Sequence, residues 1–158
     1  MTYASLSAPL SDHAIGSFAL FGMSQPSDMV ALERKGVPGA MVKSLAEKLS
    51  LTTVRFAQII GAPKATLERK AANGTLITGG SAYAALGTIK LINTVQAMLD
   101  DSKHPEAKKL DAAKWLGQWI EQPQPALGGQ KPADMMDTPT GMAMVGRVLG
   151  AITSGAYL

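Results

Sequence analysis

The sequence AAKWLGQWIEQPQPALGG, residues 112–129, decides the fold of the last third of this chain. In its first part, apolar side chains recur three and four residues apart, which is the spacing of one helical face. These residues are Ala112, Trp115, Leu116, Trp119 and Ile120. Pro123 and Pro125 then end the helix, because proline has no backbone N–H and disfavours helical backbone in the residue before it. Leu127-Gly128-Gly129 follows, an apolar anchor beside two residues that adopt positive φ without strain.

This helix is expected to begin near Ala107, and a second helix is expected beyond the glycines. Thr138 is its predicted N-cap, Pro139 its first turn and Gly155 its C-terminal cap. Its apolar face is predicted to contain Met142, Val145, Val148, Leu149 and Ile152. The segment has no Cys or His, and its carboxylates are scattered over helix ends and loops. Such a module is better suited to binding another protein than to catalysis.

Composition bounds the remaining possibilities. The chain has 158 residues, is 46% hydrophobic with helical apolar spacing, and contains no cysteine, so we predict an all-α protein without disulfides or thiolate chemistry. His13 and His104 lie far apart in polar stretches, so no metal site is expected. No apolar run approaches the roughly 20 residues that cross a bilayer, and no signal peptide is recognisable. We expect a soluble, cytoplasmic protein with no enzymatic activity.

Positive charge is concentrated in the middle of the chain. Between Pro38 and Lys90, seven basic residues stand against two acidic ones, so this segment carries +5. Because the whole chain carries +3, the rest carries −2. A local basic excess in a near-neutral protein favours a nucleic-acid partner.

The basic segment also contains the spacing of a helix-turn-helix. Thr52 or Thr53 is expected to cap one helix, and a second is expected over residues 64–72. Ala57 is small where the second helix crosses, Gly61 allows a sharp turn, and Leu67 fills the angle between the helices. In such a unit the second helix enters the major groove of DNA. The predicted DNA contacts are Lys64, Thr66, Arg69, Lys70 and Arg55. The alternative is that two short helices meet at a glycine and their basic side chains are merely solvated.

The rest of the chain is predicted more coarsely. Residues 1–26 form a tail that is either disordered or packed on a neighbour, followed by a DNA-binding and dimerisation region over 27–99 and an interaction module over 100–158. Short helices are expected over 27–35 and 37–49, and a flexible link over 74–80. The long helix predicted over 83–99 has an apolar stripe wide enough to contact both modules.

Two groups of residues resemble the Xre/MbcA/ParS antitoxins. Leu67-Glu68-Arg69-Lys70 with Gly74 and Leu76 is similar to the recognition-helix end of Xre-type antitoxins. The resemblance of the C-terminal module to their toxin-binding domain rests on Trp115-Leu116, residues 123–129, Pro132, Asp137-Thr138, Gly141, Val145, Leu149 and Gly155. It covers about residues 27–158. Gly80-Ser81-Ala82-Tyr83 departs from the Ser-Asp-Arg common in the family, and Gln124 stands where Asn is usual.

The resemblance implies a type II toxin–antitoxin module whose antitoxin has no enzymatic activity and uses no cofactor. The antitoxin would bind a RES-domain toxin that consumes NAD, cover the toxin's active site, and repress its own operon as a dimer. We predict toxin contacts at Leu127, Gly128, Gly129, Arg147, Gly155, Tyr157 and Leu158. The competing hypothesis is a helix-turn-helix transcription regulator whose C-terminal module only dimerises.

Overall fold

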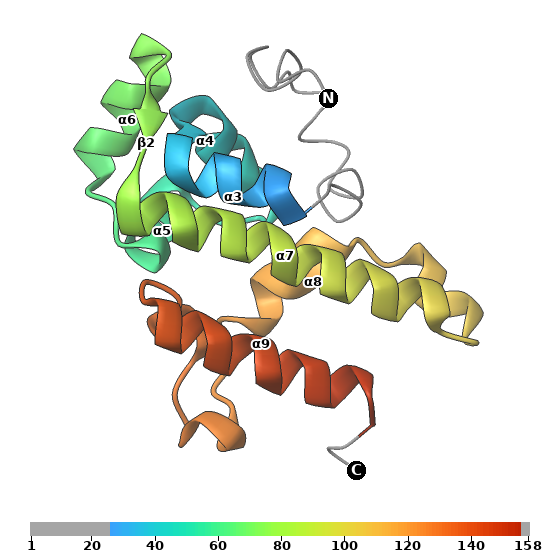
Figure 1. The fold of residues 1–158 in the computed structure, drawn as a ribbon. Helices are drawn as coiled ribbons and strands as arrows, with labels where there is room; N and C mark the ends of the chain where they lie inside the picture. The colour runs from blue at the N-terminus through green and yellow to red at the C-terminus, as the bar shows by residue number, and fades with distance from the viewer. Residues whose placement is uncertain (1–25, 156–158) are drawn as a thin grey trace.

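The computed structural model describes the backbone of residues 26–155 and the side chains of residues 29–152 and 154–155. This part of the chain is mostly helical (Figure 1), which confirms the all-α prediction. Its first elements are α3 (Pro26–Lys35), β1 (Val37–Pro38), α4 (Gly39–Lys48), α5 (Thr53–Ile60), α6 (Lys64–Asn73) and β2 (Leu76–Ile77). They are followed by α7 (Gly79–Asp101), the 3-10 helix η2 (Pro105–Lys109), α8 (Ala112–Trp119), the 3-10 helices η3 (Pro125–Leu127) and η4 (Pro132–Asp134), and α9 (Pro139–Thr153).

Helices α5 and α6 form the predicted helix-turn-helix. The Thr52 hydroxyl caps α5 by accepting a hydrogen bond from the Arg55 N–H at 3.1 Å. Gly61 ends the helix with φ 72°, a left-handed conformation that favours glycine. Leu67 of α6 and Ala57 of α5 are both buried, as the motif requires. The turn and both helices therefore match the sequence expectation.

Two short strands were not anticipated. β1 pairs antiparallel with β2, with Val37 opposite Ile77 and Pro38 opposite Leu76. The helix expected to begin at Val37 therefore begins two residues later, because Val37 precedes a proline and Pro38 itself is extended at φ −55°, ψ 134°. The predicted flexible link over residues 74–80 instead contains β2 and the first residues of α7.

Helix α7 connects the two halves of the molecule. It packs against α3 and α5 on one side and against α8 and α9 on the other, as predicted for a bridging helix (Figure 1). Gly87 of α7 faces Met142 of α9 so closely that a Cβ there would lie 2.8 Å from the methionine methyl. The buried apolar side chains of both halves form one continuous core.

The C-terminal module differs from expectation at its start. No α-helix begins at Ala107: the chain forms η2, passes through extended Leu110, and enters α8 only after Asp111. The Asp111 carboxylate accepts from the Lys114 N–H at 3.0 Å, which satisfies a free donor at the new helix start. Trp115 and Trp119 stack within α8, with ring centroids 6.1 Å apart.

The start and end of α9 follow the prediction. The Thr138 hydroxyl accepts from the Gly141 N–H at 3.0 Å, and Pro139 occupies the first turn. Gly155, at φ 73°, follows the last helical turn. Across residues 26–155, no helix combines the length and apolar character needed to cross a membrane.

Candidate functional site

The outward face of α6 is the candidate DNA surface. Lys64 and Arg69 are exposed on it, Thr66 is half-buried, and Leu67 points into the core. Lys64 lies 3.7 Å from the Glu68 carboxylate one turn further on, an exposed pair that leaves its ammonium accessible. The structure thus presents Lys64 and Arg69 on one helix, as the motif predicts, and their contact with DNA remains a prediction.

Two other residues that were predicted to contact DNA, Lys70 and Arg55, form hydrogen bonds within the protein. The Lys70 ammonium donates to the Leu76 carbonyl oxygen at 2.9 Å, so this side chain ties α6 to β2. Arg55 lies in α5, and its guanidinium is directed at the C-terminal module. The sequence analysis did not predict these partners, and the contact of both side chains with DNA stays a prediction.

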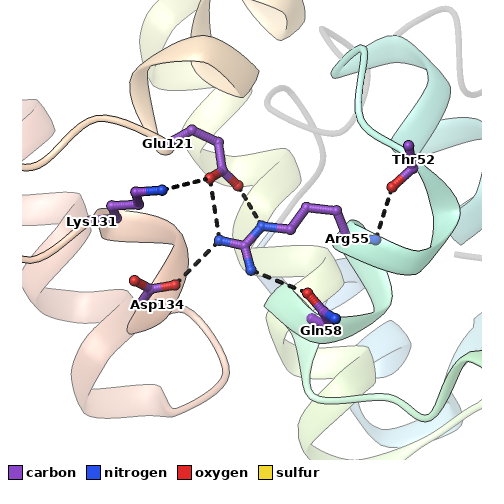
Figure 2. A network of polar contacts seen from close by, with 6 residues as sticks. All are labelled: Thr52, Arg55, Gln58, Glu121, Lys131 and Asp134. Atoms are coloured by element: carbon purple, nitrogen blue, oxygen red, sulfur yellow. Dashed lines mark hydrogen bonds and ion pairs between the residues drawn. The ribbon is translucent and has the colours of Figure 1, made fainter.

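Arg55 is the centre of a polar network between the two modules (Figure 2). Its Nε donates to Glu121 Oε1 at 2.6 Å, and Nη2 donates to Glu121 Oε2 at 3.3 Å and to Asp134 Oδ1 at 3.2 Å. Nη1 donates to the Gln58 side chain at 3.3 Å, and Lys131 approaches Glu121 at 3.6 Å. One guanidinium therefore joins α5 to two carboxylates of the C-terminal module.

The network has a clear electrostatic signature. The hydrogen bond to Glu121 raises the pKa of Arg55 above its already strongly basic value; burial opposes the shift, and the hydrogen bond to Asp134 adds to it. The Arg55 and Glu121 side chains are only 30% and 28% exposed. Because water screens these partly buried charges less than fully exposed ones, we expect the pair to stabilise more than an ordinary surface pair.

Glu121 and Asp134 stand at the two ends of a compact loop, which we call the Pro–Gly loop (residues 121–134). Its base is closed by the Ala133 N–H, which donates to the Ile120 carbonyl at 2.9 Å. Inside the loop, the backbone N–H of Gln124 donates to the Gln130 carbonyl at 3.0 Å, and the backbone carbonyl of Gln124 accepts from the Gly129 N–H at 3.0 Å. These bonds give the loop a defined shape although it contains little regular structure.

At the tip of the Pro–Gly loop, one residue points inward and two face outward. Leu127 is only 5% exposed and belongs to the core, so its side chain anchors the loop and does not itself form a surface. Gly128 and Gly129 are exposed at φ 66° and 82°, and a Cβ on either would meet nothing within 4 Å. The anchor and the left-handed glycines agree with the sequence interpretation.

The outer face of α9 adds a second exposed area. Arg147 is the one charged residue of this helix, and it is exposed beside exposed Ala143. Gly146, one residue before it, is half-buried. Gly155 is exposed just beyond the helix, whereas Tyr157 and Leu158 lie outside the described residues. The predicted toxin contacts within the described residues thus fall on the Pro–Gly loop and on α9 with the glycine after it, and their contact with a toxin stays a prediction.

Sequence reasoning missed the roles of Glu121, Lys131 and Asp134. The carboxylates of Glu121 and Asp134 looked scattered, since their partner Arg55 lies 66 and 79 positions away in the chain. The available signal was their position at the two ends of a proline- and glycine-rich loop. Within residues 26–155, no three His, Asp or Glu residues gather closely enough to hold a metal ion.

A helix-turn-helix joined by one long helix to a second, loop-bearing helical module defines the class: a two-module helix-turn-helix protein. Family models agree with this division. The antitoxin Xre-like helix-turn-helix domain matches residues 28–76, and the antitoxin Xre/MbcA/ParS C-terminal toxin-binding domain matches residues 108–155. The Prs ADP-ribosylating antitoxin of Sphingobium sp. (strain YBL2) is 34% identical over 134 residues, covering 85% of this chain and 83% of that protein. The chain belongs to the Xre/MbcA/ParS antitoxin family.

Proposed function

We propose that this antitoxin neutralises a RES-domain toxin that consumes NAD, by covering the toxin's active site. The name of its relative, the Prs ADP-ribosylating antitoxin, supports a toxin of this chemistry, because ADP-ribosylation takes its ADP-ribose from NAD. The toxin–antitoxin pair would be of type II, with one protein inhibiting the other by direct binding in the cytoplasm.

The observation that carries this proposal is the build of the Pro–Gly loop. Leu127 is fixed in the core while Gly128 and Gly129 are exposed with no side chains of their own. Backbone that is held rigidly and lies open at the surface can enter a partner's cleft closely and at low entropic cost. Arg147 on α9 would add a charged contact at the edge of the same interface. No catalytic group is assigned to the antitoxin itself.

The second part of the proposal is autorepression. The exposed Lys64 and Arg69 of α6 would contact operator DNA, and Thr66 would contribute a phosphate or thymine contact. Binding as a homodimer would match two-fold symmetric half-sites.

The test uses the full chain and the product of the neighbouring gene. Arg147→Glu should weaken the complex by roughly tenfold and restore NAD consumption by the toxin, because charge reversal repels what the arginine attracts. Arg34→Glu, the same charge change on the exposed end of α3, is the matched control and should inhibit as the wild type does.

Two outcomes would overturn the proposal. Recovery of a homodimer alone, with no complex even when the neighbouring product is co-expressed, would favour the regulator whose C-terminal module only dimerises. A stable complex in which the toxin still hydrolyses NAD would show that its active site stays open.

A further inference from the structure

We propose that Arg55, a residue of the helix-turn-helix, is a positioning residue for the Pro–Gly loop and thereby for toxin binding. The inference rests on the proposed function in one respect, the loop's contact with the toxin. It assigns to Arg55 a role in the protein–protein interface in place of a contact with DNA.

The geometry of the loop base motivates this role. Glu121 precedes the loop's proline residues and Asp134 ends η4, so the two carboxylates mark where the loop leaves and rejoins the helical body. The same Arg55 nitrogen, Nη2, donates to both, at 3.3 Å and 3.2 Å. A single planar group bound to both ends fixes the separation of those ends and hence the opening of the loop.

Charge gives a second reason. Without Arg55, Glu121 and Asp134 would be two negative charges at one loop base, with Lys131 as the remaining cation there, 3.6 Å from Glu121. Like charges held close together repel each other. The base would therefore open, and the hydrogen bonds that shape the loop tip would break more often.

The choice of arginine fits the arrangement. Nε and Nη2 donate to the two oxygens of Glu121 side by side, while Nη1 donates to the side chain of Gln58, three residues further along α5. A lysine has one compact ammonium group and cannot present this planar fork to two acceptors at fixed angles. Arg55→Lys should therefore restore the charge and only part of the geometry.

The experiment compares full-length variants. Arg55→Gln removes the charge from α5, and Glu121→Gln with Asp134→Asn removes both carboxylates without changing the helix-turn-helix. Lys90→Gln is the matched control, since it breaks a 3.0 Å ion pair between α7 and Glu33 of α3, away from the loop. Hydrogen–deuterium exchange of the Gly128, Gly129 and Gln130 amides, all hydrogen-bonded within the loop, reports on loop opening.

We expect loop amides to exchange roughly three- to tenfold faster in both network variants, which is the effect expected from losing a partly buried bidentate ion pair. Amides of α4 and α5 should exchange as in the wild type, which distinguishes positioning from general loss of stability. The association rate with the toxin should fall by a similar factor, and Arg55→Lys should recover part of it. Lys90→Gln should change neither the loop nor the association rate.

Unchanged loop exchange in Arg55→Gln would overturn the inference, as would a loss of DNA affinity with the loop unaffected, since that places the arginine on DNA. The exchange measurement needs no toxin. If the wild-type chain fails to bind the neighbouring product, the proposed function fails, and faster loop exchange would still support Arg55 as the residue that orders the loop.

Discussion

Gly117 of α8 lies directly against the backbone carbonyl of Leu49, the residue that ends α4; a Cβ on Gly117 would overlap that oxygen. Both residues are buried. Because the obstacle is backbone and cannot rotate away, a glycine is what lets the toxin-binding module approach the helix-turn-helix module at this point.

Gly117→Ala should therefore destabilise the protein, on the order of 1–3 kcal/mol, through overpacking between α8 and α4. Urea unfolding followed by tryptophan fluorescence measures the change. Gly80→Ala is the control: a Cβ there meets nothing within 4 Å, so the variant should match or slightly exceed the wild-type stability. A fully stable Gly117→Ala would contradict the close approach.

Lys64→Ala combined with Arg69→Ala should weaken operator binding and lower the slope of log K against log salt by about one for each lost phosphate contact. Lys70 is a poorer choice for this test, because its ammonium holds the Leu76 carbonyl and its loss would also disturb β2. Lys108→Ala with Lys114→Ala removes the same charge from exposed positions outside α6 and should leave the slope unchanged. Equal slopes for both double variants would place the DNA contacts elsewhere.

Leu127→Ala should lower the free energy of unfolding by about 2–4 kcal/mol, because it leaves a cavity where the Pro–Gly loop enters the core. Thermal or urea unfolding measures this loss, and toxin affinity should fall with it. Leu110→Ala provides the comparison, since Leu110 is 51% exposed and its truncation should change stability by less than about 0.5 kcal/mol. Similar losses for the two leucines would contradict the anchoring role.

The stabilising effect of Arg55 should not depend on pH through its own titration. Its folded pKa is raised by Glu121 and Asp134, so its contribution is fully present below the unfolded pKa and is lost only as pH rises through the folded value. Both values lie far above neutrality. The stability difference between wild type and Arg55→Gln should therefore stay constant from about pH 6 to about pH 10 and should shrink with added salt. A decline over that pH range would mean that another group controls the network.

Tyr157→Ala with Leu158→Ala should impair toxin neutralisation while leaving the unfolding midpoint unchanged, since these residues follow the end of α9 in the sequence. An aromatic and an apolar side chain next to each other are suited to anchor in a partner's cleft. Inhibition of NAD consumption by the purified toxin is the measurement. Full inhibition by the variant would exclude these two side chains from the interface.

Local chemistry in the sequence determined much of this protein. Thr138 was identifiable as an N-cap, and the other N-cap was narrowed to Thr52 or Thr53, because a hydroxyl before an apolar helical run satisfies a free N–H; the structure selects Thr52. Gly61, Gly128 and Gly129 were identifiable as turn positions because glycine, which has no Cβ, adopts positive φ without strain. The helix-turn-helix and the toxin-binding module followed from such signals.

Only the tertiary structure decided what the chain brings together over long distances. β1 and β2 have two residues each, too few for a periodic signal in the sequence. They form because the segments that follow α3 and α6 lie side by side in the fold. Arg55 was predicted to contact DNA because it lies in the basic segment between Pro38 and Lys90, and the sequence does not show that Glu121 and Asp134 lie beside it. A charge takes its role from what lies within a few ångströms in space, and for Arg55 that is a loop far along the chain.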